Sequence, residues 1–179
     1  MGRIVIVTGP PGAGKSTVAR RLARETDGPL AMHLHTDDFY AYIVKGFVEP
    51  WRPESQAQNV TLMNAIAAVA ATGAVGGYEV YADGVVGPWF FEPWLSAARR
   101  HGLELDYVLL MPDEATTVAR GTARTGHPMT DAAVMRQMWQ AFRDVATPPD
   151  SLLDTSGQTA DETVAAVRAG LASGRFRLL

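Results

Sequence analysis

Gly9-Pro10-Pro11-Gly12-Ala13-Gly14-Lys15-Ser16, followed by Thr17, is the most informative stretch of this sequence. It fits the pattern G-x-x-x-x-G-K-[ST], in which successive backbone N–H groups curl around the phosphates of a nucleoside triphosphate. The glycines allow positive φ angles and a close approach to phosphate that a Cβ would block. Lys15 would place its ammonium between the β- and γ-phosphates, and Ser16 would offer its hydroxyl to Mg²⁺. We therefore expect all nine residues, 9–17, to form the nucleotide-binding loop.

The residues on either side of this loop match a strand and a helix. Residues 3–8 are apolar and rich in β-branched side chains, as in a buried parallel strand. After the loop, Val18, Ala19, Leu22 and Ala23 form an apolar stripe opposite arginines, which indicates an amphipathic helix. This order places the loop at a helix N-terminus, where the dipole and unpaired N–H groups attract phosphate. The alternative is a tight glycine turn without a ligand, and the strand-loop-helix context argues against it.

Composition sets limits on the class of protein. The chain has 179 residues and no long linker, so we expect a single domain over residues 1–179. A net charge of -3 gives no electrostatic footprint for nucleic acid or an anionic membrane, and we expect neither partner. The absence of cysteine excludes disulfides and thiol nucleophiles. No apolar run suits a membrane helix, and the early first strand leaves no room for a signal peptide, so we expect a cytoplasmic protein, either monomer or homodimer.

Apolar periodicity along the rest of the chain predicts strands that alternate with helices. Such alternation implies βαβ units and a parallel sheet covered on both faces, that is, an α/β three-layer sandwich with five strands. Ligands then bind at the carboxyl ends of the strands. The expected strands are 3–8, 31–35, 78–83, 105–111 and 151–155. Helices are expected at about 36–44, 54–71, 89–101, 131–143 and 160–172, and one more begins at residue 112.

Two candidate carboxylates follow strands at this edge of the sheet. Asp37 comes after the second strand, and Asp83 ends the third. We expect Asp37 to take the proton of an acceptor hydroxyl, although Asp37 and Asp38 are also suited to cap a helix. Asp83 resembles a Walker-B acid that contacts Mg²⁺ directly or through water, and the alternative is a turn acid before Gly84. The four histidines have no spacing that indicates a metal site.

Arg120 and Arg124 lie four residues apart on one face of a predicted helix, before a Gly/Pro loop. A lid at about residues 120–135 would carry them onto the transferring phosphate and exclude water on closure. The alternative for each arginine is a solvated basic face. We expect at least one of the two to reach phosphate.

Aromatic residues gather after both candidate carboxylates. Any single one is more often part of a core, but as a group they would wall a pocket for a partly apolar acceptor. We expect this acceptor region at about 37–60 and 84–95. The residues expected to contact the acceptor are Asp38, Phe39, Tyr40, Trp51 and Trp89.

Taken together, these residues resemble the nucleoside-monophosphate-kinase-like group of P-loop proteins, over nearly the whole chain. That group includes shikimate and gluconate kinases and chloramphenicol 3-O-phosphotransferase. Thr36-Asp37-Asp38-Phe39 falls where the chloramphenicol enzyme carries its proposed base, and residues 119–124 are similar to its lid arginine segment. Residues 154–157 resemble the stretch that packs beside adenine. The resemblance implies the strand order 2-3-1-4-5, ATP as phosphate donor and Mg²⁺ as cofactor.

The chain departs from the sugar-acid kinases in its acceptor region. Shikimate kinase has an acid where this chain has His35, and residues 35–59 are aromatic where a polar signature would be expected. That segment and residues 173–177 look more like uncharacterised bacterial P-loop proteins of the AAA type.

We therefore expect an ATP-dependent kinase that phosphorylates a hydroxyl of a compact, partly apolar acceptor, such as an antibiotic. The alternatives are a nucleotide or sugar-acid kinase, and a nucleotide-binding switch or regulatory ATPase without a small-molecule acceptor.

Overall fold

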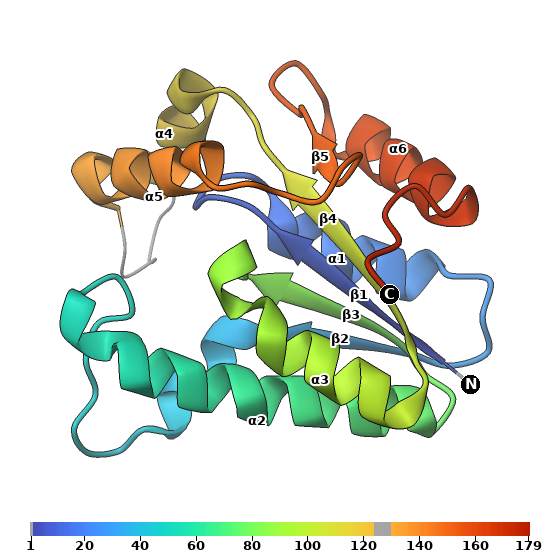
Figure 1. Cartoon of the computed structure of the whole chain (residues 1–179). Helices are drawn as coiled ribbons and strands as arrows, with labels where there is room; N and C mark the ends of the chain where they lie inside the picture. The colour runs from blue at the N-terminus through green and yellow to red at the C-terminus, as the bar shows by residue number, and fades with distance from the viewer. Residues whose placement is uncertain (1, 124–129) are drawn as a thin grey trace.

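The computed structural model describes residues 2–123 and 130–179 of the chain (Figure 1). The strands are β1 Arg3–Thr8, β2 Ala31–His35, β3 Glu79–Gly84, β4 Glu104–Leu110 and β5 Leu152–Leu153. The α-helices are α1 Lys15–Glu25, α2 Gln56–Val75, α3 Phe91–His101, α4 Glu114–Thr122, α5 Ala132–Asp144 and α6 Ala160–Ala172. Three 3-10 helices, η1 Thr36–Tyr42, η2 Pro53–Ser55 and η3 Pro88–Phe90, complete the described elements. No described helix has the length and apolar character needed to span a membrane.

The strands form one parallel sheet in the order β2-β3-β1-β4-β5. This confirms the expected α/β sandwich and the strand order 2-3-1-4-5. Because parallel neighbours are joined by crossover connections, their carboxyl ends share one edge of the sheet. β1 is the central strand, so the loop that follows it emerges at the middle of that edge.

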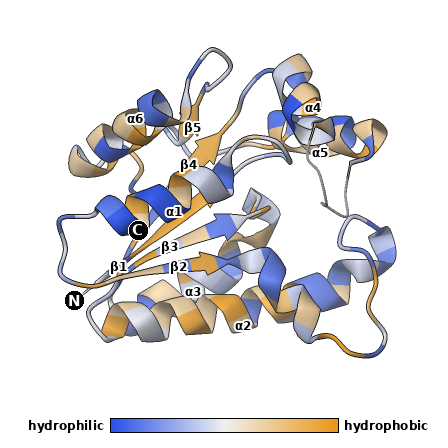
Figure 2. Ribbon diagram, turned by 180° about the vertical axis from the view of Figure 1, so that it is seen from behind, coloured by the Kyte–Doolittle hydropathy of each residue, from blue (hydrophilic) through white to orange (hydrophobic). Residues whose placement is uncertain are grey.

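Alternate residues of the strands build two separate cores. Ile4 and Ile6 of β1 face α2 and α3, whereas Val5 and Val7 face α1 and α6. Helices therefore cover both faces of the sheet, as the apolar strands require (Figure 1). Figure 2 shows the hydrophobic colour concentrated along the strands, with hydrophilic segments on the covering helices.

Three elements differ from the sequence-based expectation. The segment expected to be a helix over about 36–44 is the 3-10 helix η1, which ends at Tyr42. α2 continues past Gly73 to Val75, because this glycine lies against the sheet: a Cβ there would be 2.7 Å from the Met32 sulfur. Gly73 is thus a close-packing residue and not the end of the helix. β5 has two residues, shorter than the expected 151–155.

The packing of α2 on the sheet predicts a large difference between two of its residues. Ile66 is fully buried, whereas Val69 lies on the outer face and is 39% exposed. Ile66→Ala should lower the free energy of unfolding by about 2–5 kcal/mol, because it leaves a cavity in the core. Val69→Ala should change it by less than about 0.5 kcal/mol. Urea unfolding followed by circular dichroism tests this, and equal losses in the two variants would contradict it.

Candidate active site

The loop between β1 and α1 has glycine where the backbone requires it. Gly9, Gly12 and Gly14 all have positive φ, at 145°, 87° and 90°. A Cβ on Gly9 would lie 2.1 Å from the carbonyl oxygen of Leu110, and one on Gly12 would lie 2.4 Å from that of Thr117. The loop is therefore packed directly against the end of β4 and against α4.

Lys15 and Ser16 begin α1 immediately after this loop. The buried Lys15 side chain donates from Nζ to the carbonyl oxygen of Pro10 at 3.0 Å, so the ammonium lies over the loop. Ser16 donates from Oγ to Oδ2 of Asp83 at 2.5 Å, and Thr17 is exposed. The ammonium, the helix N-terminus and the loop backbone thus converge, which is the arrangement that binds phosphate.

Ser16 and Asp83 form an oxygen donor set that fits Mg²⁺. The two side chains touch at 2.5 Å, and both lie beside the glycine loop. Mg²⁺ prefers oxygen ligands and keeps several waters or phosphate oxygens, so one hydroxyl and one carboxylate are sufficient from the protein. Among the described residues, no group of three or more histidine, aspartate or glutamate side chains has the arrangement of a metal site formed by protein alone.

Two histidines of β2 hold the Asp83 carboxylate. The sheet register places His35 opposite Asp83. His33 donates from Nε2 to Oδ1 at 2.5 Å, and His35 donates from Nδ1 to Oδ2 at 3.0 Å, because an ionised carboxylate can only accept. Burial alone would raise the pKa of Asp83, but the hydrogen bonds from His33, His35 and Ser16 outweigh it and hold that pKa well below its usual range.

His35 links Asp83 to Asp37. The hydrogen bond to Asp83 raises the pKa of His35 above its ordinary value, against the opposing effect of burial. The other ring nitrogen of His35, Nε2, lies 4.0 Å from Oδ2 of Asp37. A carboxylate-imidazole-carboxylate row therefore runs from the nucleotide loop to Asp37.

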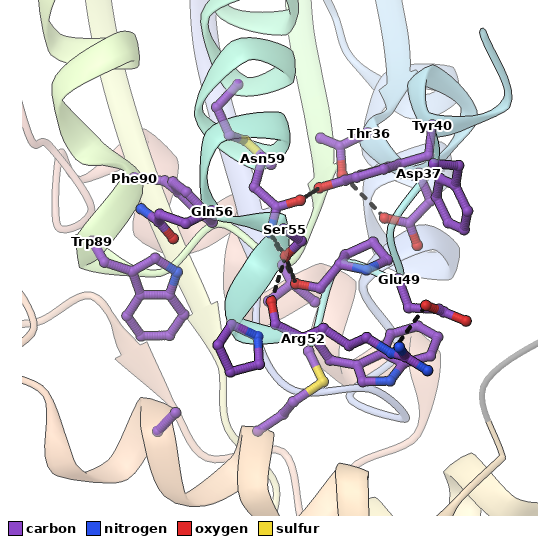
Figure 3. A pocket seen from close by; sticks show the side chains of 18 of the residues that line it. Thr36, Asp37, Tyr40, Glu49, Arg52, Ser55, Gln56, Asn59, Trp89 and Phe90 are labelled. Atoms are coloured by element: carbon purple, nitrogen blue, oxygen red, sulfur yellow. Dashed lines mark hydrogen bonds and ion pairs between the residues drawn. The ribbon is translucent and has the colours of Figure 1, made fainter. Parts of the chain in front are cut away.

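The start of η1 positions Asp37. Gly84, at the end of β3, gives Thr36 room to approach, since a Cβ on Gly84 would lie 1.7 Å from Oγ1 of Thr36. The buried Thr36 hydroxyl donates to Oδ1 of Asp37 at 3.4 Å (Figure 3). The Asp37 side chain is 52% exposed, so its carboxylate is accessible from the cleft that it lines.

That cleft has a volume of about 870 Å³. Its lining comes from η1, from the segment 47–56, from α2, from the residues around η3 and from α5, and it combines carboxylates with aromatic rings (Figure 3). The lining residues on which the function argument rests are Asp37, Asp38, Tyr40, Trp51, Trp89 and Phe90.

Polar side chains of α2 hold the segment 47–53 as one wall of the cleft. Gln58 accepts from the backbone N–H of Val48 at 2.9 Å and donates to its carbonyl oxygen at 2.7 Å. Asn59 donates to the carbonyl oxygen of Pro50 at 2.8 Å and accepts from the Tyr40 hydroxyl at 3.0 Å. Burial, together with the charge of Asp37, raises the pKa of Tyr40 to about 12, so this hydroxyl remains a donor.

α5 forms the opposite wall of the cleft. Met138 and Ala141 of this helix line it, with Gln137 beside them. The Trp89 ring lies 5.3 Å from the Phe142 ring of the same helix, measured between centroids. Trp89 thus joins the lining of the cleft to the buried side of α5.

The structure places the other predicted site residues as follows. Asp38, Tyr40, Trp51 and Trp89 line the cleft, whereas Phe39 packs against the core and is not among the lining residues. Arg120 is exposed on α4 and donates from Nη2 to the carbonyl oxygen of Gln158 at 3.3 Å. Arg124 lies outside the described residues, as does the part of the expected lid over 124–129.

Sequence reasoning did not assign a role to the histidines of β2 or to α5. The histidines have a detectable signal, because alternate residues of a strand share a face and the order 2-3-1 makes β2 the neighbour of β3. The contribution of α5 has no such signal. It depends on how α4 and α5 pack on the nucleotide loop, which local periodicity does not encode.

The strand order, the glycine loop and the acid at the end of β3 define the kinase-like P-loop fold of the nucleoside-monophosphate-kinase type. The chain belongs to the AAA domain family AAA_33, whose sequence profile matches residues 4–149. No curated protein sequence matches the chain significantly.

Solved structures share this fold at low sequence identity. A sugar kinase from Janibacter sp. HTCC2649 is 21% identical, with a TM-score of 0.71 over 96% of this chain and 95% of its own. The tunicamycin resistance protein of Deinococcus radiodurans is 16% identical, with a TM-score of 0.68 over 96% of each chain. A gluconokinase from Sinorhizobium meliloti 1021 is 20% identical, with a TM-score of 0.67 over 96% of this chain and 92% of its own.

The contact between Asp83 and His35 predicts a pH effect that can be measured without nucleotide. Asp83→Asn should lower the pKa of His35 toward its ordinary value of 6.5, because the main interaction that raises it is lost. In the wild type, the stability from this contact should be fully present below that value and lost as the pH rises through the raised pKa. Titration of the His35 ring by NMR tests this, with Asp27→Asn as a surface control. An unchanged midpoint in Asp83→Asn would contradict it.

Proposed function

We propose that the protein is an ATP-dependent phosphotransferase that moves the γ-phosphate of Mg-ATP to a hydroxyl of a compact, partly apolar acceptor in the cleft. The observation that carries this proposal is the continuity between the two sites. Ser16, Asp83 and His35 are joined by hydrogen bonds, and His35 Nε2 lies 4.0 Å from Oδ2 of Asp37 at the wall of the cleft. A switch or regulatory ATPase would need the loop but has no need of a cleft attached to it in this way.

The proposed chemistry assigns each group one task. The acceptor hydroxyl gives its proton to Asp37 while its oxygen forms a bond to the γ-phosphorus. The bond between that phosphorus and the β-γ bridging oxygen breaks, and ADP leaves. Lys15 and the loop N–H groups neutralise the phosphate oxygens. Ser16 and Asp83 would hold Mg²⁺, which would supply further positive charge beside the same oxygens.

We assign Arg120 and Arg124 to charge stabilisation above the phosphates. Arg120 belongs to α4, and the next residue of this helix, Gly121, packs against Gly12 of the loop. To reach phosphate, its guanidinium would leave the carbonyl oxygen of Gln158, a single hydrogen bond of 3.3 Å at an exposed position. This exchange is favourable when a phosphate is present, because a charge-assisted hydrogen bond is stronger than one to a neutral carbonyl.

An antibiotic suits the proposed acceptor site. Rings such as Trp51 and Trp89 supply flat apolar walls, as in sites for drug-sized molecules. The similarity to a tunicamycin resistance protein and to a gluconokinase supports a small-molecule acceptor. The test is mass spectrometry of antibiotics, nucleosides, nucleotides and sugar acids incubated with the protein and Mg-ATP. A compound that gains a phosphate supports the proposal; ATP hydrolysis with no phosphorylated compound would favour the switch.

Asp37→Asn should abolish most of the transfer. Loss of the base is expected to lower kcat by a factor of about 10²–10⁴, since the amide cannot take the proton of the acceptor hydroxyl. Affinity for Mg-ATP should stay nearly unchanged, because Asp37 lines the cleft, whereas the proposed phosphate and Mg²⁺ contacts come from Lys15 and Ser16 at the start of α1. Steady-state kinetics and nucleotide titration measure the two effects separately.

Two further variants make this test specific. Asp27→Asn changes an exposed aspartate just beyond the C-terminal end of α1, at the opposite end of the helix from the glycine loop. This variant should leave kcat as in the wild type. Asp38→Asn changes the neighbouring carboxylate. If Asp38→Asn lost the activity and Asp37→Asn kept it, Asp38 would be the base and the assignment of Asp37 would be wrong.

Lys15→Ala should weaken nucleotide binding and turnover together. The ammonium lies over the loop and would contact the transferring phosphate in both the bound and the transition state. We expect at least about a tenfold loss in Mg-ATP affinity, together with a lower kcat. Isothermal titration with Mg-ATP measures the first, and Lys45→Ala, which removes an exposed ammonium, is the matched control. Unchanged affinity in Lys15→Ala would remove this residue from the phosphate site.

A further inference from the structure

The described lining of the cleft is negatively charged. It contains three carboxylates, those of Asp37, Asp38 and Glu49, and Arg52 is its single arginine or lysine. Nε of Arg52 lies 3.1 Å from Oε2 of Glu49, so the positive charge is already balanced inside the cleft wall (Figure 3). The carboxylates of Asp37 and Asp38 have no arginine or lysine partner among the described residues.

Several neutral polar side chains of the cleft already donate their hydrogen bonds within the protein. Asn59 uses both N–H groups, donating to the carbonyl oxygen of Pro50 and to Oγ of Ser55, each at 2.8 Å. Ser55 donates to backbone carbonyls, and the Tyr40 hydroxyl donates to Asn59. The donor groups of Asn59, Ser55 and Tyr40 are thus already used within the protein.

The aromatic walls favour the same kind of ligand as the carboxylates. Tyr40, Phe47, Trp51, Trp89 and Phe90 all line the cleft. The face of an aromatic ring carries partial negative charge, which attracts cations and repels anions. Shape and charge therefore agree: the cleft suits a flat or cyclic molecule without negative charge.

We propose that the acceptor is a hydroxyl compound with an apolar ring and no anionic group, either uncharged or carrying an amine. This inference rests on the proposed phosphotransferase function. It separates the chain from kinases whose acceptors are carboxylates or phosphates. Such acceptors would bring a negative charge beside Asp37 and Asp38. The cationic groups of the described lining already face carboxylates, since Arg52 pairs with Glu49 and His35 lies between Asp83 and Asp37.

The test uses sets of related hydroxyl compounds whose members carry different charges. One set is 2-amino-1-phenylpropane-1,3-diol, its N-acetyl derivative and its N-succinyl derivative; a second is a nucleoside, its 5′-amino derivative and its 5′-monophosphate; a third is glucose, glucosamine and gluconate. Each is incubated with the full chain and Mg-ATP, and kcat/KM is measured by mass spectrometry.

In any set that is phosphorylated, we expect kcat/KM for the uncharged or amine member to exceed that for the anionic member at least about tenfold. Preference for the anionic member would overturn the inference and leave the phosphotransferase in place. Transfer to no member, with Mg-ATP bound, would contradict the phosphotransferase itself.

A variant tests the charge balance directly. Glu49→Gln removes the partner of Arg52 and should lower KM for the anionic member of a set, by up to about fivefold for an exposed pair. KM for the uncharged member should change less. Glu25→Gln, on the surface of α1, is the matched control. An unchanged ratio of the two KM values in Glu49→Gln would show that this pair does not set the charge preference, and would overturn the argument.

Discussion

The buried carboxylate of Asp83 holds the candidate site together. An ionised group without exposure to water is stable only when hydrogen bonds compensate for its lost hydration. Here the donors come from two elements, since Ser16 belongs to α1 while His33 and His35 belong to β2. The same carboxylate therefore fixes the helix that carries the phosphate loop and the strand that leads to Asp37. The spacing between the nucleotide and the proposed base follows from this one group.

Much of the fold could be predicted from the sequence, because its signals are local. The apolar strand before Gly9 and the amphipathic helix after Lys15 are evident from spacing alone, and the strand order follows from the family resemblance. Predictions failed where distant residues decide the outcome. The helix expected over about 54–71 continues past Gly73 to Val75, because the missing Cβ of this glycine gives room to Met32 of β2.

The candidate site was predictable where it depends on the ends of strands, and not where it depends on the packing of distant elements. Residues that follow strands, such as Asp37 and Asp83, could be placed at one edge because parallel strands end together. Phe39 was expected to contact the acceptor because it follows Asp37, yet it packs against the core and is not among the residues that line the cleft. The wall formed by α5 depends on contacts between elements far apart in the sequence, and no local pattern carries that information.

The two walls of the cleft are attached to the protein in different ways. Gly12 of the loop lies against Gly121 of α4, where a Cβ on Gly12 would be 3.0 Å from the Gly121 nitrogen. Gly121 in turn lies against Met135 of α5. The segment 47–53 is fastened mainly to α2, by amides such as Gln58 and Asn59. One wall is thus packed against the glycine loop through α4, whereas the other is held by hydrogen bonds to a helix on the opposite side of the cleft. Substitutions in the second wall could therefore change the shape of the cleft and leave the packing of the glycine loop intact.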